Sequence, residues 1–325
     1  MMQEKEANFY MPQELLEALR RQHYAVFGHS AVKLCHYTKA SIKQEKVCYK
    51  EQFYGIRCHR CLQMSPAVVF CNQQCIYCWR PLARVDLKKL NEAYWPPSKI
   101  VKKAIEEQKQ LLSGLGGIKE RIDLKKFEEA QEPKHAAISL SGEPTLYPKI
   151  GELIEEFFNA EFSTVFLVTN GTMPEKLSAL KTKPTQLYLS LEAVNQEMHL
   201  KINKPIMPNT WQRINKSLEL LKDLKKETRT CIRITAIKNL NMENTAKEFS
   251  RLIQKAEPDF VEVKGYSWVG FSRHRLEEAN MPSLKEVENF AKEINEYLNY
   301  KIADVHKDAR VVLLESGTKE RKIKF

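Results

Sequence analysis

Three cysteines lie close together in the stretch "FCNQQCIYCWRP", which runs from Phe70 to Pro81. Cys71, Cys75 and Cys78 are separated by three residues and then by two. Three thiolates on one short loop can bind a metal centre, but a tetrahedral structural zinc or iron site takes four protein ligands. The spacing therefore predicts a metal centre that leaves one position open to another ligand.

Four more cysteines precede this loop, at Cys35, Cys48, Cys58 and Cys61. Seven of the eight cysteines thus lie between Cys35 and Cys78, and in a reducing compartment such a concentration favours metal ligands over disulfides. Cys58 and Cys61 form a CxxC pair, which is a common half of a four-cysteine zinc site. The residues alone therefore indicate a second metal site, and zinc bound by all four cysteines is one form that it can take.

The composition of the whole chain limits the classes of protein to consider. It has 325 residues, of which 43% are hydrophobic, enough to bury a substantial core in one large α/β domain or in a main domain with an appendage. Neither a membrane-spanning apolar run nor an apolar signal stretch is visible, so we expect a cytoplasmic protein without membrane contact. A net charge of +11 favours an anionic partner such as nucleic acid, although both signs are interspersed along most of the chain.

The elements that must position these cysteines follow an alternating pattern. Short apolar runs alternate with amphipathic stretches of helical length, such as residues 150–160 and 209–227, and this pattern builds βα units around a parallel sheet. The predicted strands are residues 66–70, 135–142, 163–171, 186–193, 230–237 and 259–266. Six such units predict an α/β fold that forms an open or partial (β/α)6 barrel.

Polar residues follow five of these strands at the point where each strand ends. The stretches are "FCNQQCIYC", "SLSGEPTL", "TNGT", "SLEA" and "VKGYSWVG". In parallel βα architectures the carboxyl ends of the strands meet at one edge of the sheet, where active sites are built. Ordinary turns would account for one or two polar exits, but five favour a shared pocket.

The cysteine loop resembles that of the radical S-adenosylmethionine enzymes, whose mark is a CxxxCxxC loop after the first strand of a partial, TIM-like barrel. The aromatic Tyr77 before the last cysteine strengthens the match. The resemblance implies that Cys71, Cys75 and Cys78 hold a 4Fe–4S cluster whose fourth iron binds S-adenosylmethionine and, once reduced, releases a 5′-deoxyadenosyl radical. A zinc knuckle or a set of buried thiols is the alternative interpretation of the loop.

The ends of later strands are similar to cofactor contacts of the same family. "SLSGEPTL" resembles the family's GGEP segment, with Ser141 in place of the first glycine. Gly142 would allow close backbone approach, and Glu143 would accept a hydrogen bond from the α-ammonium group of the cofactor. The residues that the resemblance places at the cofactor's ribose and carboxylate are Asn170, Ser190 and Glu192.

Upstream of the loop and over nearly the whole chain, the sequence is similar to the tRNA 4-demethylwyosine synthases, the radical enzymes of wyosine biosynthesis. The stretches that carry this similarity include "AVKLC", "FYGI", "HRC", "EPKHAAISLSGEPTLYP" and "SRHRL". In that family three upstream cysteines bind a second 4Fe–4S cluster, which implies this role for Cys35, Cys48 and Cys61. Cys58 departs from the family pattern and is either a spare thiol, an alternative ligand or a sign of a different site.

The same resemblance implies an activity. The family condenses N1-methylguanosine beside the anticodon of tRNA-Phe with pyruvate to form the tricyclic 4-demethylwyosine, and a lysine that matches Lys50 is proposed to form a Schiff base with pyruvate. That amine must be unprotonated, which burial beside other positive charge favours. Binding of the pyruvate carboxylate to the open iron of the second cluster is the alternative, and the two modes are not exclusive. The target base must leave its stack, so we expect an aromatic and basic rim that contacts bases and phosphates, with Trp268, Arg273, His274 and Arg275.

Domain organisation and partners are further expectations. Residues 1–64 should form an N-terminal extension with the ligands of the second cluster, and residues 65–325 a partial barrel of the radical S-adenosylmethionine type with a C-terminal extension. Cys35 comes too early for the flavodoxin-like domain of eukaryotic relatives, so a separate electron donor is expected, and the chain should be a monomer. Two alternatives stay open: a radical enzyme with a substrate other than tRNA, and a zinc-bearing RNA-binding protein without catalysis.

Overall fold

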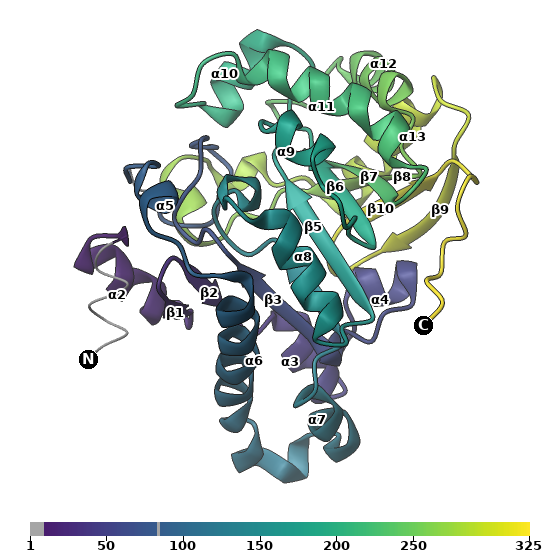
Figure 1. Ribbon diagram of the computed structural model, residues 1–325. Coiled ribbons are helices and arrows are strands. Elements are labelled where there is room, and N and C mark those ends of the chain that lie inside the picture. Colours follow the sequence, from purple (N-terminus) through teal and green to yellow (C-terminus); the bar gives the residue numbers. More distant parts are fainter. Residues whose placement is uncertain (1–9, 83–84) are drawn as a thin grey trace.

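Ten strands form one mixed sheet in the computed structural model, which describes residues 10–82 and 85–325 (Figure 1). The strand order is β1-β2-β3-β4-β5-β6-β7-β8-β10-β9. The strands are Ala25–Phe27 (β1), Ser30–Val32 (β2), Cys61–Ser65 (β3), His135–Ile138 (β4), Thr164–Thr169 (β5), Gln186–Ser190 (β6), Arg229–Ala236 (β7), Phe260–Gly265 (β8), Lys301–His306 (β9) and Val311–Glu315 (β10). Because β3 to β8 pair in parallel in the order of the sequence, the predicted partial (β/α)6 barrel is confirmed.

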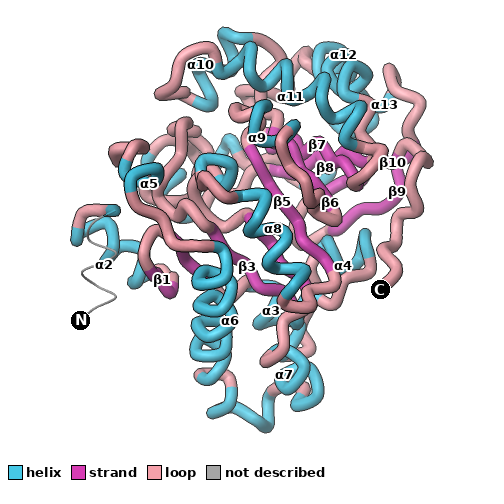
Figure 2. The backbone as a smooth tube through the Cα atoms, in the orientation of Figure 1, coloured by secondary structure: helices cyan, strands magenta, loops and turns pink. Residues whose placement is uncertain are grey.

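Helices surround the strands, as the cyan and magenta segments of Figure 2 show. They are Gln13–Arg21 (α2), His36–Ile42 (α3), Tyr49–Tyr54 (α4), Lys89–Glu92 (α5), Pro97–Ser113 (α6), Leu124–Ala130 (α7), Ile150–Asn159 (α8), Pro174–Ser178 (α9), Gln196–Asn203 (α10), Thr210–Leu224 (α11), Ala246–Ala256 (α12) and Leu284–Asn295 (α13). The largest core packs apolar side chains of α8, α11, α12 and α13 against the sheet. The helices predicted at residues 150–160 and 209–227 are α8 and α11, and their buried side chains explain the helical periodicity.

The first parallel strand differs from its prediction. It is β3, whereas the predicted strand at residues 66–70 is wrong, since these residues form turns. Pro66 lacks the N–H that a further ladder bond would need. The next two amides are already bonded elsewhere: Ala67 N donates to Ser65 Oγ at 3.1 Å, and Val68 N donates to His29 O at 2.9 Å. The chain therefore leaves the sheet after Ser65, before the apolar run of residues 66–70.

Antiparallel strands that the sequence reading missed extend the sheet on both sides. β1 and β2 pair onto β3, and β10 and β9 pair onto β8. The strands β9 and β10 lie in the predicted C-terminal extension. The predicted division into residues 1–64 and 65–325 stays a prediction, and its boundary falls within β3.

The inner face of the barrel is partly filled by α4. Alternate residues of each strand point to opposite faces, so Val165 and Leu167 of β5 pack in the core beneath the helices while Phe166 faces inward. On that inner face, the rings of α4 pack against Phe166, Tyr188 and Phe260. The N-terminal region therefore reaches the barrel interior.

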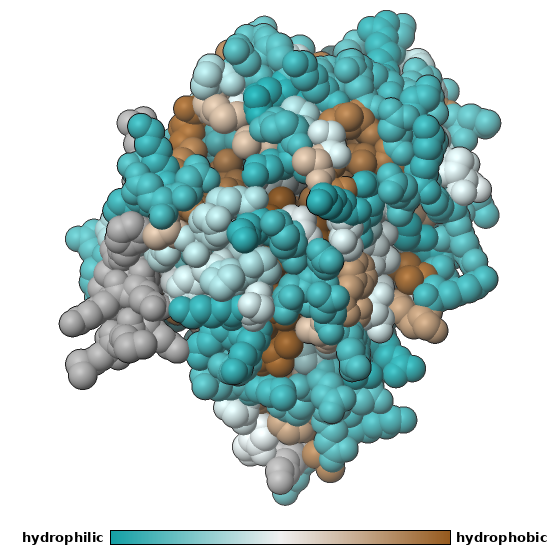
Figure 3. Space-filling model, viewed as in Figure 1, coloured by the Kyte–Doolittle hydropathy of each residue, from teal (hydrophilic) through white to brown (hydrophobic). Residues whose placement is uncertain are grey.

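The surface seen in Figure 3 is mainly hydrophilic, with small apolar patches between polar side chains. This agrees with the interspersed charges of the sequence. In the described part of the chain, no helix combines the length and the apolar character that crossing a bilayer requires.

Candidate active site

The loop that follows β3 carries the three cysteines and is fastened to α10. Ile76 N donates to Ile202 O at 2.9 Å, and Asn203 Nδ2 lies 3.5 Å from the sulfur of Cys75. Cys78 N donates to Cys75 O at 3.1 Å, which closes a tight turn. The end of α10 thus helps to hold the cysteine loop in place.

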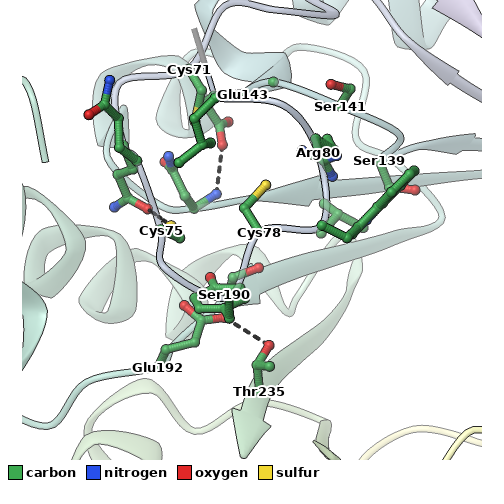
Figure 4. Close-up of a pocket in the computed structure, with 18 of the residues that line it drawn as sticks. Cys71, Cys75, Cys78, Arg80, Ser139, Ser141, Glu143, Ser190, Glu192 and Thr235 are labelled. Carbon is green, nitrogen blue, oxygen red and sulfur yellow. Dashed lines mark hydrogen bonds between the residues drawn. The ribbon is translucent and has the colours of Figure 1, made fainter. Parts of the chain in front are cut away.

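A cavity of about 460 Å³ opens beside this loop at the carboxyl ends of the strands. Its lining includes all ten residues that the sequence assigned to the first cluster and the cofactor: Cys71, Cys75, Tyr77, Cys78, Ser141, Gly142, Glu143, Asn170, Ser190 and Glu192. Figure 4 shows the three labelled cysteines around the same space as Glu143 and Glu192. The expected shared pocket is therefore present, and it draws its residues from the loops after β3, β4, β5 and β6.

Gly142 and Ser141 join the loop after β4 to the cysteine loop. Gly142 has a φ of +69°, and a Cβ on it would lie 1.8 Å from the carbonyl oxygen of Ala67. Only glycine fits so close a backbone approach. The Ser141 hydroxyl donates to Val68 O, and Ser65 Oγ donates to Ser141 O. The serine that departs from the family's glycine therefore bonds the two loops together.

Glu143 is buried, with 2% of its surface exposed, and its carboxylate accepts four hydrogen bonds. The donors to Oε1 are Thr145 N at 3.1 Å, Thr145 Oγ1 at 2.6 Å and Thr169 Oγ1 at 2.7 Å, and Asn170 N donates to Oε2 at 2.8 Å. Burial raises the pKa of Glu143, and these hydrogen bonds oppose the rise. The carboxylate thus ties the ends of β4 and β5 and keeps capacity on Oε2 for a further donor.

The Asn170 side chain is part of a polar network that the sequence did not predict. Its Nδ2 donates to Asn72 Oδ1 at 2.9 Å, while its Oδ1 accepts from Thr172 Oγ1 at 2.6 Å. Asn72 Nδ2 in turn donates to Thr172 Oγ1 at 2.7 Å. Since Asn72 directly follows Cys71, this network fixes the start of the cysteine loop against the exit of β5.

Glu192 forms the opposite wall of the cavity. It accepts hydrogen bonds from Thr235 Oγ1 at 3.2 Å and from Asn203 Nδ2 at 3.3 Å, the first of which is drawn in Figure 4. Burial raises the pKa of Glu192 to about 7, and hydrogen bonds from Tyr77, Asn203 and Thr235 limit that rise. A carboxyl group with this pKa can hold or release a proton near neutral pH.

The donor set of this cavity suits an iron–sulfur cluster. Three thiols line it together, and one iron would remain for a small-molecule ligand in the adjoining space. Among residues 10–82 and 85–325, no three His, Cys, Asp or Glu side chains are close enough to bind a single metal ion. A cluster takes each thiolate at a different iron, so wider spacing is compatible with it.

The second set of cysteines lies near the amino-terminal end of β3. Cys35 and Cys48 precede the first turns of α3 and α4, and Cys61 is the first residue of β3. The three thiols interact electrostatically: after burial, Cys35 is the next largest cause that raises the pKa of both Cys48 and Cys61. The structure therefore brings these three predicted ligands together from distant parts of the N-terminal region.

Cys58 has different surroundings. Its backbone N–H donates to Glu51 Oε2 at 2.7 Å, and its sulfur lies 3.4 Å from Cys48 N and 3.8 Å from Tyr37 O. Burial, followed by the charge of Glu51, raises the pKa of this thiol. Cys58 thus contacts backbone groups and a carboxylate beside the second set.

Lys50 lies within the barrel interior, with 7% of its surface exposed. Its Nζ is 4.5 Å from the ring centroid of Phe166 and 5.0 Å from that of Tyr188. Burial lowers the pKa of Lys50, and the neighbouring Arg233 lowers it further. The burial and the adjacent cation that an imine-forming amine requires are therefore both present.

Sequence reasoning missed two other cations of this interior, Arg233 of β7 and Lys264 of β8. Both line the cavity, and burial, followed by the charge of Arg233, lowers the pKa of Lys264 to about 8. The sequence did contain a signal for both residues. "TCIRITAI" and "DFVEVKGY" each place charged residues within a mainly apolar strand, and a buried charge usually has a partner or a function.

The segment from Tyr266 to Leu276 lies at the cavity, but its residues differ in availability. Trp268 Nε1 donates to Leu276 O at 2.8 Å, and the Arg273 guanidinium is 4.8 Å from the Trp268 ring. Arg273 and His274 are exposed. Arg275 instead points to the cysteine loop, where it donates to Ile76 O at 3.1 Å and to Cys78 O.

Two family models match this chain in succession. Residues 66–252 match the radical SAM superfamily, and residues 255–316 match wyosine base formation. Among curated relatives, the S-adenosyl-L-methionine-dependent tRNA 4-demethylwyosine synthase of Pyrococcus abyssi is 47% identical over 95% of this chain and 90% of its own length. The protein of the same name from Methanocaldococcus jannaschii is 40% identical over 95% of this chain and 98% of its own length.

Two solved structures are similar over nearly the full length. One is a structure of TYW1 with a lysine-pyruvate adduct bound, which is 37% identical and covers 97% of this chain and 98% of its own, with a TM-score of 0.85. The other, a crystal structure of archaeal TYW1, is 34% identical and covers 96% of this chain and all 100% of its own, with a TM-score of 0.79.

Proposed function

This chain belongs to the family of S-adenosyl-L-methionine-dependent tRNA 4-demethylwyosine synthases, and we propose its reaction within that family. The chain is a wyosine-forming radical SAM enzyme that modifies tRNA. The proposed reaction condenses N1-methylguanosine beside the anticodon of tRNA-Phe with pyruvate to form 4-demethylwyosine. The radical SAM family implies S-adenosylmethionine and a 4Fe–4S cluster. We assign the cluster to Cys71, Cys75 and Cys78 and the cofactor to the adjoining cavity. When bound, they supply the radical that activates the N1-methyl group of the guanosine.

The observation that carries the proposal is the position of Lys50. Its amine lies close to two aromatic rings and beside Arg233, in the interior of the barrel. The cofactor cavity lies at the carboxyl ends of the strands of the same barrel. The solved structure of a 37% identical TYW1 has a lysine-pyruvate adduct bound, which supports a lysine adduct in this chain as well. We therefore assign the adduct-forming amine of this chain to Lys50.

The bond changes at Lys50 follow from imine chemistry. The neutral amine adds to the carbonyl carbon of pyruvate, and loss of water leaves a C=N bond between Lys50 Nζ and that carbon. Arg233 disfavours protonation of the amine, and the apolar faces of Phe166 and Tyr188 desolvate it. Pyruvate would thereby be held in the barrel interior as the acceptor of a carbon radical formed on the base.

The remaining assignments concern the second cluster and the tRNA. Cys35, Cys48 and Cys61 would bind a second 4Fe–4S cluster, with Cys58 outside the ligand set. The exposed Arg273 and His274, with Trp268, would form the rim that receives the flipped base and its phosphates. A separate electron donor, a monomeric state and a cytoplasmic location stay predictions from the sequence.

The experiment that tests the proposed function is an anaerobic reaction of the reconstituted protein with S-adenosylmethionine, pyruvate, a chemical reductant and a tRNA-Phe that carries N1-methylguanosine. We expect the tricyclic nucleoside in the nuclease digest, detected by mass spectrometry. The matched control is the same tRNA without the methyl group, which should give no tricyclic product. Cleavage of S-adenosylmethionine without any tricyclic nucleoside would favour a different substrate.

A further inference from the structure

The sulfur of Cys75 contacts two side-chain amides. Asn203 Nδ2 donates to this sulfur at 3.5 Å, and the thiol itself donates to Gln73 Oε1 at 3.4 Å. All three side chains are buried. Because Cys75 is the middle one of the three predicted ligands of the loop, a group that hydrogen-bonds its sulfur also acts on the metal centre that the sulfur binds.

The backbone holds both amides beside this sulfur. Gln74 N donates to Asn203 O at 3.0 Å, and Gln73 forms an isolated antiparallel bridge with Pro205. The cysteine loop is thus paired with the end of α10 and with the residues that follow it. The two amides reach Cys75 from these paired segments, so their positions are set by the fold and not only by their own rotamers.

The Asn203 amide already has the orientation that a metal-bound cysteine requires. Its Nδ2 carries two N–H groups, and the structure gives acceptors for both, the sulfur of Cys75 and Glu192 Oε2 at 3.3 Å. The amide therefore presents a donor to the sulfur. A thiolate is a better acceptor for this donor than a thiol, because the bond is then assisted by the negative charge.

The Gln73 amide has the opposite orientation. Its Oε1 accepts from the thiol, whereas its buried Nε2 has no hydrogen-bond partner among the described residues. A buried N–H without an acceptor is costly. A cysteine that binds iron has lost its proton, so its sulfur can only accept, and turning the amide over exchanges Oε1 and Nε2. Metal binding thus gives the Gln73 N–H the acceptor that it lacks.

We propose that Gln73 and Asn203 each donate an N–H hydrogen bond to the Cys75 thiolate and thereby raise the reduction potential of the first cluster. This inference rests on the proposed function, because it takes Cys71, Cys75 and Cys78 as the ligands of that cluster. Reduction adds negative charge to the cluster and its sulfurs, so hydrogen bonds to sulfur stabilise the reduced state more than the oxidised state. Both amides act through the sulfur and need no contact with the substrate.

The test is a redox titration of the full-length, anaerobically reconstituted protein, followed by EPR. The signal that changes when S-adenosylmethionine is added belongs to the first cluster, which separates it from that of a second cluster. Gln73→Met and Asn203→Leu keep a side chain of similar size but remove the donor. In each variant we expect the ratio of reduced to oxidised cluster at a fixed potential to fall by up to about tenfold, equivalent to about 59 mV for one electron.

Gln74→Met is the matched control, because Gln74 is the next residue of the loop and is only half-buried. Its titration should match that of the wild type. Iron content is measured alongside, and where one donor variant loses its iron the other decides.

Three results would each overturn the proposal: an unchanged or raised ratio in a donor variant that keeps its iron, an equal decrease in Gln74→Met, or loss of iron in both donor variants, which would assign the amides to holding the loop. Unchanged ratios with normal 5′-deoxyadenosine production would leave the proposed function intact. A wild type without any signal that responds to S-adenosylmethionine would remove both.

Discussion

The two cysteine sets lie on either side of β3 and are built in different ways. Cys71, Cys75 and Cys78 share one loop after the strand, and hydrogen bonds from the ends of α10 and β5 hold that loop. Cys35, Cys48 and Cys61 come from three elements, the starts of α3, α4 and β3. The first set is therefore a local motif, whereas the second exists only after the N-terminal region has folded against the barrel.

This difference indicates that the two cysteine sets have different roles. The first set faces the cavity with the cofactor residues, while the second lies beside the buried amine of Lys50, which interacts with both Cys48 and Cys61. Arg233 and Lys264 line the cavity of the first set. Burial raises the pKa of the Cys48 thiol of the second set, and the charge of Lys264 opposes that rise. One end of the barrel would then generate the radical, and the other would hold the carbon unit that the radical attacks.

The largest effect is expected at the first set. Replacing Cys75 with alanine should abolish the reductive cleavage of S-adenosylmethionine, because a cluster with two thiolates loses its support. Production of 5′-deoxyadenosine by the anaerobic enzyme measures this directly. Cys71→Ala and Cys78→Ala should behave alike. Retained 5′-deoxyadenosine production in all three variants would remove this loop from the cofactor chemistry.

The second set should separate ring formation from cofactor cleavage. Cys48→Ala should remove about half of the iron and stop formation of the tricyclic base, yet leave part of the 5′-deoxyadenosine production, because the first set is intact. Cys58→Ala is the matched control and should keep its iron, since its thiol contacts backbone groups and lies next to Glu51. A zinc-containing site that needs Cys58 as much as Cys48 would contradict the second cluster.

The same contrast explains what the sequence could predict. The metal-binding loop at Cys71 could be predicted because the spacing of its cysteines is local. The shared pocket could be predicted because parallel strands end at the same edge of a sheet. The motif around Gly142 also predicted a close backbone approach at that glycine, and the contact is with the carbonyl oxygen of Ala67. The second set, by contrast, was indicated only by family resemblance, since residues alone equally allowed a zinc site with Cys58.

The features that were missed depend on tertiary packing. β9 and β10 were not predicted, although β10 is the apolar run "VVLLE", because the βα alternation indicates only parallel strands and these two strands extend the sheet antiparallel to β8. The strand predicted at residues 66–70 failed because its amides bond outside the sheet. Arg233 and Lys264 were visible as charges in apolar strands, but only the fold shows that they face the same interior as Lys50.

A smaller and more selective effect is expected from Lys50. Lys50→Arg keeps the positive charge but cannot form an imine, so formation of the tricyclic base should be lost while 5′-deoxyadenosine is still produced. Affinity for tRNA should stay nearly unchanged, because the proposed tRNA contacts Arg273 and His274 are exposed, whereas Lys50 is buried. Nuclease digestion with mass spectrometry and a binding titration measure the two quantities. Full product formation by Lys50→Arg would move the pyruvate site away from α4.

The smallest effect should come from Arg275, which the sequence placed among the tRNA contacts. Its guanidinium bonds the carbonyls of Ile76 and Cys78, so Arg275→Gln should loosen the cysteine loop and lower 5′-deoxyadenosine production by roughly tenfold, the equivalent of about one charge-assisted hydrogen bond. Iron content should be retained, because all three thiols remain. The measurement is the rate of cofactor cleavage in the absence of tRNA, where RNA contacts play no part.

Arg273→Gln is the matched comparison for Arg275→Gln. Arg273 is exposed and stacks on Trp268 two residues before Arg275, so its loss should weaken tRNA binding and reduce the salt dependence of that binding. The two neighbouring arginines would then serve different ends of the reaction, one the RNA and the other the cysteine loop. If Arg275→Gln weakened tRNA binding while cofactor cleavage without tRNA stayed at the wild-type rate, both arginines would belong to the RNA interface, and α10, Asn170 and the loop after β4 would hold the cysteine loop.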